Sequence, residues 1–304
     1  MIQFLRSTKY QQQIEPSDAL SSGSWVRCER PDESEVASLA EIGLDIDIVQ
    51  DALDPHEVPR VEQDDGWTYF ITRLPDTDDD FNDFTTPILF AIHHKYVATV
   101  SRDNLSRLWQ PFMDTVHIST GDQTQLFAHM IDAITTQYQR RVATINRQMR
   151  AAISDVQNLG SKDIAVLTDY ERKLNDYLDA LVPTTAALQK ILSGKVIPLQ
   201  ETDRDLVEDV TIDIEQVSAR CKSLLRTITN VRDSYRAVMD TRLNETIRLL
   251  TVITVSLTIP TMIAGLFGMN VPIPFANSPL AFWEILGVSA IIAALIGFYF
   301  LRKR

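Results

Sequence analysis

The fold is decided by residues 249–270, which read LLTVITVSLTIPTMIAGLFGMN, and by residues 285–301, which read ILGVSAIIAALIGFYFL. The uncharged stretches are 19 residues for Leu249–Phe267 and 17 residues for the second segment, and a membrane-spanning helix needs about 20. Helix-breaking residues separate them: Gly268, Pro272, Pro274, Asn277 and Pro279. This pattern predicts a helical hairpin in a membrane. A buried hairpin in a soluble protein is the less favoured alternative, because a core helix is rarely uncharged on every side.

The rest of the chain is acidic. The 304 residues include 41 Asp and Glu against 29 Lys and Arg, which gives a formal net charge of −12. Residues 249–304 contribute +2, so residues 1–248 carry −14. Such a body lacks the basic face that neutralises phosphates, and this excludes nucleic acid as a partner.

The basic residues predict how the hairpin is oriented. Arg242 and Arg248 precede the first span, Arg302–Arg304 follow the second, and the connecting loop has no Lys or Arg. By the positive-inside rule, both termini are expected in the cytoplasm and the loop outside. The N-terminus lacks a basic start followed by an apolar run, so no signal peptide is expected. We therefore expect a two-span protein of the cell (inner) membrane.

Residues 1–120 are predicted to form an α/β cytoplasmic domain. Its β-rich runs are Trp25–Arg30, Thr68–Leu74, Ile88–His93 and Tyr96–Ser101. His93-His94-Lys95 is expected to turn the last two runs into a hairpin. Residues 51–59 and 76–83 are expected to be polar connections.

Residues 121–200 are predicted to form an antiparallel pair of cytoplasmic helices. Apolar residues recur every three or four positions from Phe127 to Val156, and Gly160 is expected to stop this helix. A second pattern runs from Leu167 to Leu181, with a kink expected at Pro183 and an end at Gly194.

Residues 201–268 are predicted to form one long stalk helix that continues into the first span. Thr202 is the expected N-cap, and no Pro or Gly follows until Pro260. At about 1.5 Å per residue such a helix would extend about 100 Å, of which only about 30 Å fits in a bilayer. An extracellular loop at 269–284 and a second span with a basic tail at 285–304 complete the expected organisation.

Polar residues follow one face of the first span. At spacings of three and four lie Thr251, Thr254, Thr258 and Thr261, and the same face reaches back to Ile247 and Asn244. Several copies of this face would line a narrow polar tube. Alternatively, each threonine bonds the carbonyl four residues earlier and needs no water. The stripe alone leaves both interpretations open.

The end of this span carries a tripeptide, Gly268-Met269-Asn270, which closes the stretch that begins at Ala264 and follows Pro260-Thr261. Alone, it indicates no more than a helix C-cap. Together with two C-terminal spans, a long stalk and a positive-inside bias, it resembles the CorA family of magnesium channels, whose signature is Gly-Met-Asn at this place. Gln50–Leu53 and Val58–Glu62 also resemble that family's Glu-Asp-Ala-Leu and Arg-Pro-Lys regions.

The resemblance implies a homopentameric funnel in the lipid bilayer that takes up Mg²⁺ passively. It implies an outer selectivity ring made of Gly268, Met269 and Asn270. Mg²⁺ sheds water reluctantly, and neutral Asn270 oxygens can accept hydrogen bonds from its coordinated water without stripping it. Gly268 is expected to let the backbone turn and approach the axis.

The resemblance also implies roles for further single residues in and just before the first span. Asn244 matches a polar ring at the inner mouth, Leu250 a hydrophobic constriction, and Thr261 a pore-lining threonine. Thr258 stands where a branch of the family has a constricting methionine, and Pro260 is one position later than expected. Glu284 is the only carboxylate near the loop, which leaves the choice of metal open.

Acidic residues at the start of the stalk form a candidate regulatory site. Asp205, Asp209 and Asp213 lie four apart, and Asp209 matches a family position that binds regulatory Mg²⁺ between subunits. The partner carboxylate is expected among Asp76, Asp78, Asp79, Asp80 and Asp83. The alternative is a solvated acidic helix face.

Other functions are kept as alternatives. They are a Zn²⁺ transporter of the related branch and a non-transporting membrane-anchored sensor; Co²⁺ and Ni²⁺ are further possible cargo. The sequence contains no Gly-rich phosphate loop, nucleophile elbow or zinc-protease motif, so no catalytic residue is assigned and no enzyme is expected.

Overall fold

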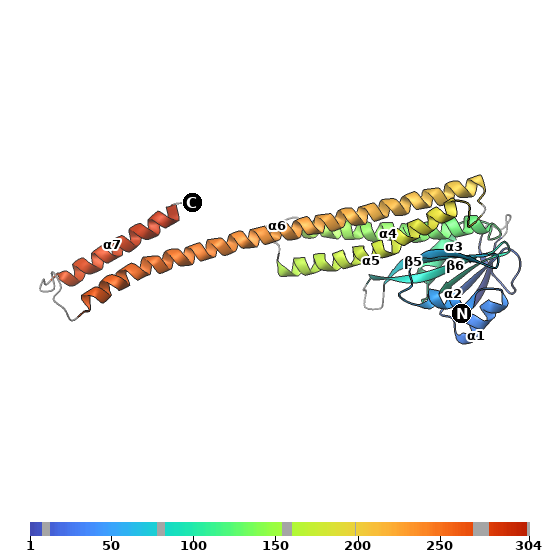
Figure 1. The fold of residues 1–304 in the computed structure, drawn as a ribbon, viewed down its shortest axis with the longest axis horizontal. Helices are drawn as coiled ribbons and strands as arrows, with labels where there is room; N and C mark the ends of the chain where they lie inside the picture. Colours follow the sequence, from blue (N-terminus) through green and yellow to red (C-terminus); the bar gives the residue numbers. More distant parts are fainter. Residues whose placement is uncertain (8–12, 78–82, 154–159, 198, 270–279, 303–304) are drawn as a thin grey trace. The chain divides into compact units, whose positions relative to one another are not determined.

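The computed structural model describes the chain except for residues 8–12, 78–82, 154–159, 198, 270–279 and 303–304 (Figure 1). The described residues form two compact units, Met1–Val231 and Arg232–Arg304. The longest helix, α6 (Glu201–Phe267), contributes to both units. The predicted division into five segments stays a prediction.

The first unit contains a seven-stranded sheet with the order β2-β1-β3-β7-β6-β5-β4. The strands are β1 (Ile2–Arg6), β2 (Glu15–Ser17), β3 (Ser24–Glu29), β4 (Arg60–Asp64), β5 (Trp67–Thr77), β6 (Asp83–Ile92) and β7 (Tyr96–Ser101). β3 and β7 pair in parallel, and the other neighbours pair antiparallel. The parallel pair joins segments about 70 residues apart in the chain.

The four predicted strands are confirmed, and so is the hairpin at His93-His94-Lys95. The His93 amide donates to the Tyr96 carbonyl at 2.9 Å, and the Tyr96 amide donates back at 3.2 Å. The two polar connections are partly wrong. Residues 51–53 end a helix, α2 (Ile46–Leu53), and residues 76 and 77 extend β5, because pairing with β6 continues to that point.

Helices cover both faces of the sheet (Figure 1). On one face lie α1 (Glu33–Glu41) and α2, which share a core with Tyr69, Leu89 and other inward-pointing strand residues. The other face is covered by α3 (Ser106–Thr115), α4 (Gln123–Ala152) and α5 (Ser161–Leu192). There the ring of Phe127 meets Phe70 and Phe90 edge-on, at 5.1 and 5.5 Å between centroids.

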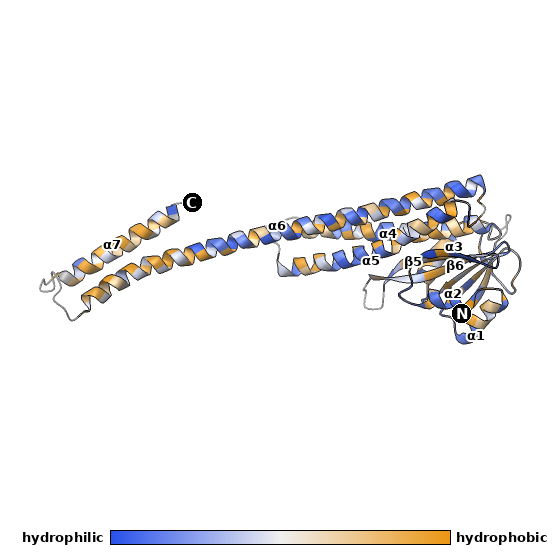
Figure 2. Cartoon of the chain, in the orientation of Figure 1, coloured by the Kyte–Doolittle hydropathy of each residue, from blue (hydrophilic) through white to orange (hydrophobic). Residues whose placement is uncertain are grey.

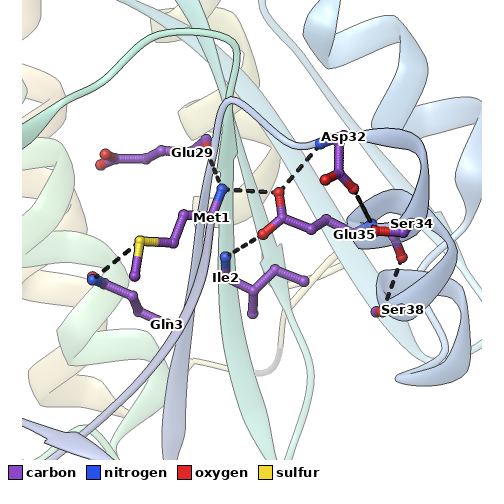
Figure 3. A network of polar contacts seen from close by, with 8 residues as sticks. All are labelled: Met1, Ile2, Gln3, Glu29, Asp32, Ser34, Glu35 and Ser38. Carbon is purple, nitrogen blue, oxygen red and sulfur yellow. Dashed lines mark hydrogen bonds and ion pairs between the residues drawn. The ribbon is translucent and has the colours of Figure 1, made fainter.

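A polar network ties β1 to the start of α1 (Figure 3). The Glu35 carboxylate accepts hydrogen bonds from the Ile2 amide at 2.8 Å and from the Met1 amino group at 2.9 Å. Asp32 accepts from the Glu35 amide and its own amide donates to Glu35, which makes a capping box. The hydrogen bond from the amino group is the main cause that lowers the pKa of Glu35.

The predicted pair α4 and α5 is confirmed, and Tyr138 meets Tyr177 across it at 5.3 Å between ring centroids. The prediction that Gly160 stops the first helix is wrong. α4 ends at Ala152, and Gly160 is the N-cap of α5, where its amide donates to Asp163. Val156 lies outside the described residues. α5 runs through Pro183 and ends before Gly194, whose φ of +71° suits a helix C-terminus.

The first part of α6 packs against the helical pair. Its buried residues alternate at spacings of three and four, which is typical of helices that pack at a shallow angle: Val207, Val210, Ile214, Val217, Cys221, Leu224, Ile228 and Val231. Gln189 of α5 donates to Glu215 of α6 at 3.1 Å. The N-cap prediction at Thr202 is wrong, because α6 already begins at Glu201.

The second unit consists of the rest of α6 and of α7 (Ala281–Arg302). Figure 2 shows the apolar colouring of α7 and of the C-terminal part of α6. Both helices are long and apolar enough to cross a membrane, and only 6% of each apolar window is buried. The alternative of a hairpin buried in a soluble core is therefore wrong, because the described part of the chain leaves both apolar windows almost wholly exposed.

Phe127→Ala should destabilise the first unit by about 3–5 kcal/mol, because it leaves a cavity between the sheet and α4. A denaturant titration of the detergent-solubilised chain, followed by the fluorescence of Trp25, Trp67 and Trp109, measures this. The control Val166→Ala changes a 43% exposed side chain, so its effect should stay within about 0.5 kcal/mol. Equal midpoints for the two variants would contradict the described core.

Candidate functional site

One face of the α6 span packs on α7. Val252 is 7% exposed, and the hydroxyl of Ser256 is buried. A Cβ added at Gly297 of α7 would lie 3.5 Å from that hydroxyl oxygen. Val252 and Ser256 are four residues apart, so they lie on the same side of the helix.

The threonine stripe lies on the other side of this helix. At about 100° per residue, Thr251, Thr254, Thr258 and Thr261 point roughly opposite to the Val252 and Ser256 face. All four threonines are exposed in the single chain. The predicted stripe therefore exists as one continuous polar face that α7 does not cover.

Each threonine hydroxyl donates to the carbonyl four residues earlier. The distances are 2.9 Å from Thr251 to Ile247 and 2.8 Å for Thr254, Thr258 and Thr261 to their acceptors. The two interpretations of the stripe are thus compatible. Because each proton is given to the backbone, the oxygen lone pairs remain as acceptors on the exposed face. Acceptors are what the water shell of a hydrated cation needs, since coordinated water donates.

Towards the N-terminal end of the span, the same face becomes apolar. Ile247 is 52% exposed and Leu250 is 63% exposed, and Asn244 is exposed one turn earlier. Exposed apolar side chains of this kind form a constriction that dewets when several copies surround one axis. The order along the face is thus amide, apolar residues, then threonine hydroxyls.

The signature tripeptide begins where α6 ends. The Gly268 amide donates to the Ala264 carbonyl at 3.0 Å, and the Met269 amide donates to Leu266 at 3.3 Å. Gly268 does not have a positive φ, and an added Cβ would meet only ordinary contacts of 3.5 Å. A left-handed turn is therefore not the reason for glycine here. Met269 is 53% exposed, and Asn270 lies outside the described residues.

The two N-terminal segments that resemble the family are in contact. Arg60 donates to Asp51 at 2.8 Å and also pairs with Glu57 and Glu62. The ion pairs connect the end of α2 to the start of β4. This arrangement holds together the region that the sequence singled out, and it assigns Arg60 a structural role.

The acidic residues of α6 differ in their surroundings. Asp205 and Asp209 are exposed, whereas Asp213 is partly buried. Burial raises the pKa of Asp132 on α4, and the charge of Asp213 raises it further, while His129 lowers it. Sequence analysis missed Asp132, because only the packing of α4 on α6 brings it close to a residue 81 positions later.

Among the described residues, no group of three or more His, Cys, Asp or Glu side chains is placed to hold a metal ion. Of the expected partners of Asp209, residues 78–80 lie outside the described part of the chain, Asp76 lies in β5, and Asp83 is the first residue of β6. Nothing within one chain therefore completes a cation site around Asp209 in the described ranges.

A sequence model of the family described as CorA-like Mg²⁺ transporter protein matches residues 21–304. The chain belongs to the CorA family. The resemblance carried by Gly268-Met269-Asn270 is thus confirmed at the level of the family. Two curated relatives are both named cobalt/magnesium transport protein CorA.

The relative from Methanocaldococcus jannaschii is 24% identical over 302 residues, which cover 92% of this chain and 90% of the relative. The relative from Thermotoga maritima is 21% identical over 271 residues, which cover 84% of this chain and 75% of the relative. Both matches cover more than four-fifths of this CorA chain.

Solved structures confirm the fold class. The complete structure of the CorA magnesium transporter from Methanocaldococcus jannaschii superposes with a TM-score of 0.87 at 20% identity, covering 100% of this chain and 98% of that one. The full-length CmaX protein gives 0.75 at 16% identity, over 98% of this chain and 96% of that one. An α/β domain, long helices and two apolar C-terminal helices are thus the architecture of this CorA chain.

Thr258→Val should reduce cation flux about fivefold, because it removes one acceptor per copy at nearly constant volume. Ile253→Val is the matched control, since Ile253 lies on a flank of the same helix, away from the stripe, and should leave flux within about twofold. The flux of a divalent cation into proteoliposomes, detected with a fluorescent dye, measures the effect of both variants. A larger loss for Ile253→Val than for Thr258→Val would contradict the assignment of the face.

Proposed function

We propose that the protein is a passive channel for divalent cations, chiefly Mg²⁺, built from several copies around one axis. The observation that carries this proposal is the exposed threonine face, which lies opposite the face that packs on α7. Two spans per chain cannot enclose a pore, so the face needs copies of itself. Family membership supports five copies in a funnel-shaped homopentamer.

The ion is selected in its hydrated form at the outer end of α6. Gly268, Met269 and Asn270 form the ring, and the neutral amide oxygens of Asn270 accept hydrogen bonds from coordinated water. The names of the two relatives, cobalt/magnesium transport proteins, support Mg²⁺ and Co²⁺ as cargo, with Ni²⁺ as a similar ion. Mg²⁺ acts as cargo and as regulator in this proposal.

The pore narrows at Ile247 and Leu250, where apolar rings exclude water when the channel is closed. Asn244 provides a polar ring on the cytoplasmic side of this constriction. Above it, the hydroxyl oxygens of Thr251, Thr254, Thr258 and Thr261 line the conduit. Thr258 offers no second apolar constriction, so gating rests on the lower rings.

Internal Mg²⁺ closes the channel through the acidic face of α6. Asp209, with Asp205 beside it, is exposed and able to share a cation with a carboxylate of a neighbouring copy. Asp213 is the weaker candidate, because it is partly buried near Asp132 of its own chain. When internal Mg²⁺ falls, like charges face each other and favour opening.

The hairpin crosses the cell (inner) membrane with both termini in the cytoplasm. The basic residues that flank the spans and the absence of Lys and Arg from residues 268–280 support this orientation. Inward flux of a divalent cation then follows the membrane potential. No catalytic residue takes part.

Two other functions remain testable. A Zn²⁺ transporter would share the hairpin, and the fold of the ZntB cytoplasmic domain from Vibrio parahaemolyticus matches with a TM-score of 0.66 at 13% identity, over 79% of this chain and 98% of that one. A non-transporting sensor would use α6 only as a stalk. Parallel flux measurements with Mg²⁺, Co²⁺, Ni²⁺ and Zn²⁺ distinguish these functions.

Asn270→Ala should reduce Mg²⁺ uptake into proteoliposomes by about tenfold or more, because the ring loses its acceptors for coordinated water. Asn277→Ala is the control, since it removes an amide from the same outer segment but outside the signature, and should keep uptake within about twofold. Uptake by Asn270→Ala at the level of the unaltered protein would remove the filter from the proposal and favour the sensor.

Asp209→Ala should weaken the inhibition of uptake by internal Mg²⁺, raising the half-inhibitory concentration about fivefold, because a ligand of the closing cation is lost. Asp233→Ala is the matched control on the same helix, where Asp233 pairs with Arg236 at 3.5 Å. It should leave inhibition unchanged. Identical inhibition curves for both variants would remove Asp209 from the sensor.

A further inference from the structure

A side chain of α6 caps the basic end of α7. The Arg248 guanidinium donates through Nη2 to the main-chain carbonyl of Phe300 at 2.7 Å. Phe300 lies in the last turn of α7, which ends at Arg302. The last carbonyls of a helix have no partner within it, and a cation is favourable beside them.

Arg248 belongs to the face of α6 that packs on α7. Arg248, Val252 and Ser256 are four residues apart, so the three lie in one row along the helix. Val252 is buried at the middle of this row, and Ser256 closely approaches Gly297 at its far end. The hydrogen bond to Phe300 therefore closes a contact row that holds α7 along one side of the first span.

The same row determines where the opposite face points. Ile247 immediately precedes Arg248 in the sequence and is about 100° away around the helix. Ile247 and Thr251 are exposed on the face that α7 does not cover. If α6 rotated about its axis at Arg248, the lower end of the threonine face would turn with it.

We infer that Arg248 is a positioning residue, which fixes the rotation of the first span against the second and thereby aims Ile247 and the threonine face at the conduit. This inference rests on the proposed transport function. Arg248 itself does not contact the ion. Its guanidinium acts through the main chain of α7, where its planar shape directs a charged donor at one carbonyl.

The rotation can be measured without transport. Cysteines at Ser256 and Gly297 should form a disulfide, because a Cβ added at Gly297 would lie 3.5 Å from the Ser256 Oγ, the position that a cysteine sulfur would take. Cys28 and Cys221 are buried and do not interfere. In the Arg248→Gln background, oxidative cross-linking of Ser256→Cys with Gly297→Cys should slow about fivefold, because a charge-assisted hydrogen bond no longer holds the row together.

Mg²⁺ transport should change in parallel with the cross-linking rate. Arg248→Gln should lower Mg²⁺ flux about fivefold, and the completed 256–297 cross-link should restore flux to at least about half of the unaltered level. Arg248→Lys keeps a charged donor but lacks the planar guanidinium. Its cross-linking rate and its flux should lie between those of Arg248→Gln and those of Arg248. Arg242→Gln is the control that removes another positive charge from α6, and it should leave both measurements within about twofold.

The outcomes separate the inference from the proposed function. An unchanged cross-linking rate in Arg248→Gln overturns the positioning role, whatever the flux. A slowed rate with unchanged flux, or lost flux that the cross-link does not restore, overturns the connection between rotation and transport. Absence of flux in the unaltered protein overturns the proposed function, while the cross-linking rate still decides whether Arg248 orients the span.

Discussion

A polar group that leaves water for a hydrocarbon environment needs a partner inside the protein, and the C-terminal part of this chain is organised by that requirement. The four threonine hydroxyls of the span donate to their own helix at 2.8–2.9 Å. The Phe300 carbonyl, in the last turn of α7, accepts from Arg248. In the sequence, the prolines of this part of the chain stand between the two apolar stretches and not within them, apart from Pro260.

The two parts of α6 are suited to two different environments, water and the membrane. Up to Val231, α6 buries one row of apolar residues, spaced by three and four, and exposes charged residues to water. Beyond Leu249 it exposes apolar side chains and keeps its four threonines on one narrow face. Hydrophobic burial stabilises the first part, whereas backbone satisfaction and packing on α7 shape the second.

Charge is distributed according to the same division. The acidic residues are concentrated in residues 1–248, while the threonine face of the first span offers only neutral acceptors. Neutral oxygens bind coordinated water more weakly than carboxylates bind a metal, and a conducting site must release its ion. In the proposed function, the strong ligands therefore regulate from the cytoplasm and the weak ones conduct.

By itself, the sequence determined the hairpin, the threonine face, the family signature and the main strands and helices, because each depends on residues close together in the chain. The helix boundaries predicted at Gly160 and Thr202 were wrong, since capping depends on which neighbouring amides are available. Only the tertiary structure decided the parallel pairing of β3 with β7, the proximity of Asp132 to Asp213, and the ion pair of Arg60 with Asp51. It alone decided which face of the first span packs on α7, because that face is chosen by contacts between residues about 40–50 positions apart.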